Sequence, residues 1–254
     1  MTNIRRLLVA LLLVASASLC QRVEPLVTVP FVGCAADGQQ GPIAAPAGRP
    51  KRVALPANLA NKLAWYSTAR DAVGIGVLAP RGWHCFGTYG SSGASLYVAP
   101  EPLDSDKVLM HKNWHGFSGL AVQRSLSDGG TSGRFKVAQV IARVFPAHRD
   151  FVRSVVAEKL QPESDFPFGP YPSDKLHYLN RELVDFTTPA NADGLGTASW
   201  LIRNADPIRG FAALFPDDDM TLQQLDMRLG PGNQGIESAL INAMEQEILS
   251  QRGS

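Results

Sequence analysis

Trp83, His84 and Cys85 are consecutive in an aromatic stretch rich in glycine, and they are the first candidates for chemistry in this chain. A thiol beside an imidazole can act as a nucleophile and its base when the two side chains meet. In a strand, however, adjacent side chains point to opposite faces. A strand therefore separates His84 from Cys85, and it places Cys85 on the inward face that Trp83 and Tyr89 share.

His111 and His115 are four residues apart, a spacing that puts both imidazoles on one side of a helix and suits a metal ion. Neither an acidic residue nor a third histidine lies directly beside them, and Asn113 and Gly116 weaken a helix here. The sequence therefore favours two surface histidines next to a packed Trp114, and we expect neither a metal nor a cofactor.

Other catalytic patterns are missing from the sequence. Gly90-Ser91-Ser92-Gly93 lacks the glycine spacing of a nucleophile elbow, and its position between two strands suits a hairpin turn. The chain also has neither His-Glu-x-x-His nor Cys-x-x-Cys. We therefore expect a non-catalytic binding or interaction protein. The alternative is a secreted hydrolase of unfamiliar type that uses His84 or the His111/His115 pair.

The N-terminus predicts export. Arg5-Arg6 precede an apolar run from Leu7 to Val14, and Ala15-Ser16-Ala17 follows as a small-x-small cleavage site. These features are typical of a secretory signal peptide over residues 1–17. Cys20 leaves lipidation open as an alternative, although the bulky Leu19 before it fits a lipoprotein signal poorly. The protein is then periplasmic or secreted, with membrane contact only through a lipid on Cys20.

Cys34 and Cys85 remain as a pair if Cys20 is lipidated, and paired cysteines of exported proteins usually form a disulfide. This bridge closes a loop of about 50 residues and stabilises the fold by roughly 4 kcal/mol in the chain-entropy model. The alternative is that both remain free thiols.

Composition limits the classes of partner. The chain has 254 residues, of which 45% are hydrophobic and 19% charged, and its formal net charge is +1. This is typical of a globular protein, and the near-neutral charge gives no support for a nucleic-acid partner, which calls for a basic surface.

The remaining patterns predict elements that position these residues. Residues 18–56 are rich in proline and glycine and suggest a loop-rich lead-in, while residues 57–254 suggest a single domain. Apolar spacing predicts helices near 135–159 and 233–251, and a further helix over Pro56–Tyr66. Strands are expected over 74–78, 81–89, 94–98, 120–126, 183–186, 197–202, 207–215 and 222–229. The fold class that follows is α+β, a single layered domain with a mainly antiparallel sheet packed against helices.

The central hairpin and an aromatic loop from Phe166 to Tyr171 mark a candidate binding surface. It combines Trp83 and His84 of the central hairpin with Trp114 and with Phe168, which lies in a long proline-rich connection. Long connections often carry function. The expected partner is an envelope protein, a peptide or a cell-wall component.

Overall fold

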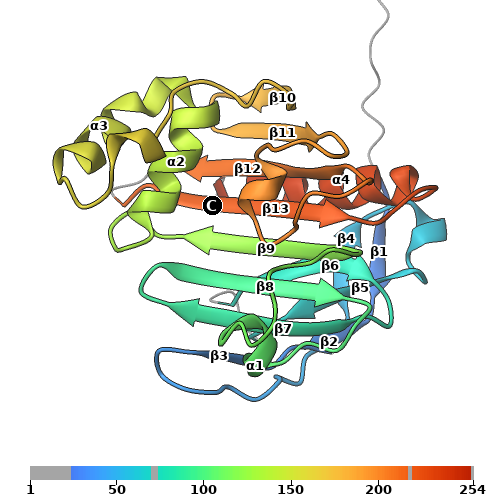
Figure 1. Ribbon diagram of the computed structural model, residues 1–254. Helices are drawn as coiled ribbons and strands as arrows, with labels where there is room; N and C mark the ends of the chain where they lie inside the picture. The colour runs from blue at the N-terminus through green and yellow to red at the C-terminus, as the bar shows by residue number, and fades with distance from the viewer. Residues whose placement is uncertain (1–23, 70–73, 217–218, 253–254) are drawn as a thin grey trace, which may run out of the picture.

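The computed structural model describes residues 24–69, 74–216 and 219–252, a mixed α/β chain with mostly antiparallel sheets and four α-helices in this part. The strands of the largest sheet are β3 (Ala36–Gly38), β7 (His84–Gly90), β8 (Gly93–Ala99), β9 (Ala121–Ser127), β10 (Lys175–Asn180), β11 (Leu183–Thr188), β12 (Ile208–Phe215) and β13 (Thr221–Arg228). Their order across the eight-stranded sheet is β10-β11-β12-β13-β9-β8-β7-β3, as Figure 1 shows. Only β3 joins its neighbour in parallel.

Two smaller sheets come largely from the first third of the chain. β2 (Phe31–Gly33), β5 (Leu63–Ser67) and β6 (Gly76–Pro80) form a three-stranded sheet, and β1 (Leu26–Val29) pairs with β4 (Lys51–Ala54). The proline-rich segment therefore contains four short strands, β1 to β4, where loops were expected. The signal peptide and the lipidation of Cys20 were predicted for residues that lie outside the described part.

The predicted central hairpin is confirmed. β7 and β8 pair in antiparallel register from His84–Ala99 to Gly90–Gly93, with the Gly/Ser segment as the turn. The Cys34–Cys85 disulfide is also confirmed, and it links residues 51 positions apart. It ties the segment between β2 and β3 to the first strand of the hairpin.

Strand β13 shows how the two faces of the large sheet differ. Leu225 and Met227 share a buried apolar cluster with Leu240 and Met244 of the C-terminal helix. The alternate residue Asp226 points to the opposite face, because side chains alternate along a strand. That face packs with the second apolar cluster, to which α2 (Arg134–Val144) contributes many residues.

The helices are α1 (Ser105–Val108), α2 (Arg134–Val144), α3 (Arg149–Ala157) and α4 (Gln234–Arg252).

Two predicted elements are wrong. The segment Pro56–Tyr66 was expected to be a helix, but it forms a 3-10 turn followed by β5. All five residues of β5 are buried, which means that both faces of the strand are covered, so apolar residues occur without strand alternation. A strand was also expected over 197–202, where the chain instead makes a 3-10 turn at Gly196–Ala198.

Candidate functional site

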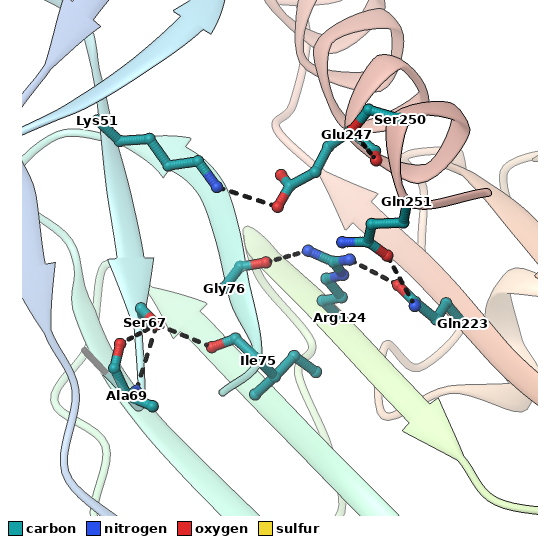
Figure 2. A network of polar contacts seen from close by, with 10 residues as sticks. All are labelled: Lys51, Ser67, Ala69, Ile75, Gly76, Arg124, Gln223, Glu247, Ser250 and Gln251. Atoms are coloured by element: carbon teal, nitrogen blue, oxygen red, sulfur yellow. Dashed lines mark hydrogen bonds and ion pairs between the residues drawn. The ribbon is translucent and has the colours of Figure 1, made fainter. Parts of the chain in front are cut away.

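A cavity of about 900 Å³ lies where β4, β5 and β6 meet β9 and the last turns of α4; we call it the Arg124 pocket. Figure 2 shows its polar network, in which side chains from these separate elements converge. The lining residues are Phe31, Ala47, Gly48, Arg49, Pro50, Lys51, Trp65, Ser67, Ala69, Gly74, Gly76, Arg124, Glu247 and Gln251.

Arg124 is the most deeply placed cation of the pocket. It belongs to β9, and only 5% of its surface is exposed. Its guanidinium donates hydrogen bonds to the backbone carbonyl of Gly76 and, at 2.6 Å, to Oε1 of Gln223. Burial lowers the pKa of Arg124, and the charge of Glu247 acts in the opposite direction. Because an arginine pKa starts far above neutrality, the side chain remains a positive charge.

Lys51 provides a second cation in the wall of the pocket. Its Nζ atom lies 3.0 Å from Oε1 of Glu247 and 3.5 Å from the centre of the Trp65 ring. The Trp65 ring in turn packs closely over β6, where a Cβ atom at Gly76 would lie 2.5 Å from a ring carbon. Glycine at position 76 thus permits the close approach that puts the aromatic wall next to the cations.

The charges in this pocket suit an anion. Among the described lining residues, Arg49, Lys51 and Arg124 are cationic, and Glu247 is the single acid. The one hydroxyl in the lining is already engaged, because Ser67 Oγ donates to the carbonyl of Ala69 at 2.8 Å. The arrangement of these side chains therefore suits the binding of a ligand better than catalysis by a nucleophile and its base.

The four residues predicted to bind a partner are distributed over both sides of the large sheet. Trp83 packs against the first apolar cluster, and His84 is exposed on β7. Trp114 packs against the second cluster, and its ring stacks on that of Trp200 with centres 5.1 Å apart. Phe168 is 49% exposed, and the guanidinium of Arg149 lies 5.2 Å from its ring centre. Their role in binding stays a prediction.

The segment with the histidine pair is not helical. α1 ends at Val108, and His111 has a positive φ of 51°. The His111 ring stacks on Trp200 with centres 4.6 Å apart. In the described residues, no group of three or more His, Cys, Asp or Glu side chains is arranged to hold a metal ion.

A glycine-rich sequence, Gly-x-Gly-x-x-Gly, runs from Gly230 to Gly235 between β13 and α4. A strand, these glycines and a helix resemble the order of a dinucleotide site, in which phosphate lies at the helix N-terminus. Here the carboxylate of Glu237 occupies that end of α4, where it accepts a hydrogen bond from the backbone N–H of Leu229 at 3.3 Å. The flanking strands of β13 are antiparallel, unlike those of a dinucleotide-binding unit.

The residues of the Arg124 pocket were not predicted from the sequence. One signal was available, because Arg124 lies on the same strand face as Val122 and Leu126 in a strand that was correctly predicted. An arginine on the apolar face of a strand is unusual and points to a buried charge. The contributions of Lys51 and Glu247 had no such signal, since they come from opposite ends of the chain.

Comparisons of the chain with protein-family models, with curated proteins and with solved structures found no match. None of the helices in the described residues combines the length and apolar character needed to cross a membrane.

Proposed function

We propose that the protein is an exported, non-catalytic binding protein and that its ligand occupies the Arg124 pocket. The observation that carries this proposal is a buried, positively charged Arg124 beside a cavity of about 900 Å³. Ligand sites for small molecules commonly measure roughly 300–1,000 Å³ and combine apolar walls with a few polar groups. The pocket has both, with Trp65 as wall and Arg124 and Lys51 as polar groups.

Export is part of the proposal. The Cys34–Cys85 disulfide supports it, because disulfides persist in oxidising compartments and are rare in the cytosol. The signal peptide predicted over residues 1–17 points the same way. The proposal also takes residues 57–254 as a single layered domain of strands and helices. We propose that the ligand comes from the cell envelope, as a small component of the wall, a peptide or part of an envelope protein.

Blocking the pocket tests this function. Ala47 is exposed and lines the pocket, whereas Ala44 is exposed on the same segment and is not among the lining residues. A fragment library is screened against the wild type, Ala47→Trp and Ala44→Trp by ligand-observed NMR. We expect a set of fragments that bind the wild type and Ala44→Trp and that lose binding in Ala47→Trp. If every bound fragment binds all three proteins alike, or if none binds, the assignment of the pocket is wrong.

A further inference from the structure

We infer that the Arg124 pocket recognises an oxyanion, a carboxylate or phosphate group, attached to a flat apolar ligand. The inference rests on the proposed function and adds the chemical class of the ligand. Three features of the pocket carry it: an excess of positive charge around a buried arginine, a carboxylate already accommodated beside one of the cations, and aromatic walls.

Among the described residues Arg124 forms no ion pair, although the charge of Glu247 acts on it. Its described hydrogen bonds go to a carbonyl and an amide oxygen, which are both neutral acceptors. Buried charges are normally paired with an opposite charge, because leaving water is costly for an ion. Glu247, the one acid among the lining residues that the structure describes, forms an ion pair with Lys51. A ligand anion would therefore supply the charge that balances Arg124.

Glu247 also shows that this pocket accepts a carboxylate. One of its oxygens lies 3.0 Å from Nζ of Lys51, within charge-assisted hydrogen-bond distance. Arginine and lysine bind carboxylate and phosphate groups through the same kind of contact, and such bonds are roughly twice as strong as neutral ones. Arg49, a further lining cation, is exposed, and its charge adds to the positive potential that would attract an anion to the pocket.

The remainder of the ligand is expected to be flat and apolar. Phe31 and Trp65 both line the pocket, and aromatic rings favour planar groups that stack or meet them edge to face. Gly48 lies directly against the Phe31 ring, since a Cβ atom there would come within 2.5 Å of it. The lining thus places an apolar wall beside the cations.

A competing role for Arg124 is to connect two sheets. Its contacts join β9 to Gly76 of β6 and to Gln223 of β13, and this alone could account for a buried arginine. The two roles differ in what they predict for ligands. A purely structural Arg124 adds nothing to a preference for a charged ligand over its neutral isostere, whereas in an oxyanion site built on Arg124 the preference depends on that residue.

Matched pairs of acids and amides decide between them. The wild-type protein is titrated with benzoate, phenylphosphonate and benzamide, and with acetate as an acid without a ring. We expect benzoate or phenylphosphonate to bind at least about tenfold tighter than benzamide, because a charge-assisted contact replaces a neutral one. The stronger of the two identifies a carboxylate or a phosphorus oxyanion as the natural group, and acetate should bind more weakly than benzoate.

Variants assign the preference to the residue. Arg124→Gln should remove the preference for acids, and Arg124→Lys should keep part of it because the charge remains. Arg153→Gln is the control, since Arg153 is an exposed arginine on α3 and is not among the lining residues of the pocket. If Arg124→Gln fails to fold, the wild-type comparison still tests whether the pocket prefers an acid, and a preference that Arg124→Lys leaves unchanged would count against Arg124 as the recognising group.

The outcomes separate this inference from the proposed function. If acids and amides bind equally and Ala47→Trp blocks both, the pocket is a binding site but the oxyanion inference is overturned. If the preference for acids persists in Arg124→Gln, Arg124 is not the recognising group and the inference also fails. If Ala47→Trp blocks neither kind of compound, the proposed function fails with it.

Discussion

Lys51 and Glu247, 196 residues apart in the chain, form an ion pair with Nζ and Oε1 separated by 3.0 Å. The pair joins β4 to the last turns of α4 beside the Arg124 pocket (Figure 2). It closes one side of the site with residues from both ends of the described chain, and it determines how much positive charge remains for a ligand.

The charge of this pair predicts opposite effects of two neutral substitutions on anion binding. Glu247→Gln removes the one acid of the described lining residues and should tighten benzoate binding several-fold, whereas Lys51→Gln should weaken it. Both side chains are partly exposed, at 21% and 36%, so the free energy of unfolding should change by at most about 1 kcal/mol. Calorimetric titration measures the first effect and urea unfolding the second. Equal affinities in the two variants would contradict the electrostatic account.

Buried Asp226 predicts a pH-dependent stability. Burial raises the pKa of Asp226 from 3.8 to about 7, although the hydrogen bond from Gln224 and the charge of Lys136 lower it in part. Between these values the folded protein holds a proton that the unfolded chain has released. Stability therefore falls as the pH rises from about 4 to 7, by at most about 1.4 kcal/mol per pH unit, and this contribution is constant above the upper value.

Asp226→Asn tests this dependence, because the amide cannot ionise and its oxygen can still accept the hydrogen bond from Gln224. Urea unfolding at a series of pH values should give a flatter profile for Asp226→Asn than for the wild type. Asp150→Asn serves as the control, since the Asp150 side chain is 94% exposed. Parallel profiles for the wild type and Asp226→Asn would show that Asp226 does not set the slope.

The disulfide predicts a large loss of stability on its removal. Replacing Cys34 and Cys85 together by alanine should lower the free energy of unfolding by roughly 4 kcal/mol, the value expected for a loop of about 50 residues. The loss arises mainly because the unfolded chain regains freedom. Wild-type protein unfolded with and without reductant provides the comparison. An unchanged urea midpoint after complete reduction would be inconsistent with a stabilising bridge.

The predicted export signal gives a mass that can be checked. For a soluble exported protein, the intact, non-reduced mass should equal that of a chain that starts at Ser18, less two hydrogens for the Cys34–Cys85 bridge. A mass equal to that of a chain that starts at Cys20 and carries acyl groups would establish the lipoprotein alternative. A mass that includes Met1 to Ala17 would show that the signal-peptide prediction is wrong. Mass spectrometry of protein isolated from the exporting cells distinguishes the three.

The sequence by itself determined the elements in which local pattern and burial agree. The hairpin at Gly90–Gly93 follows from glycine at a turn between two runs of extended, aromatic or apolar residues. α2 and α4 follow from apolar stripes of helical period. The Cys34–Cys85 bridge was predicted from the two cysteines that remain when Cys20 is set aside and from the oxidising compartment, with two free thiols as the alternative, and the structure has the bridge.

Only the tertiary structure decided β5 and the pocket. The Leu63–Ser67 segment is apolar enough for a helix or a strand, and pairing with β2 and β6 selects the strand. The pocket needs Lys51, Arg124 and Glu247 to meet from β4, β9 and α4, and local sequence patterns carry no information about such distant contacts. The sequence shows Arg124 as an unusual residue on an inward strand face. What the side chain faces, however, depends on how the three-stranded sheet and α4 pack over β9.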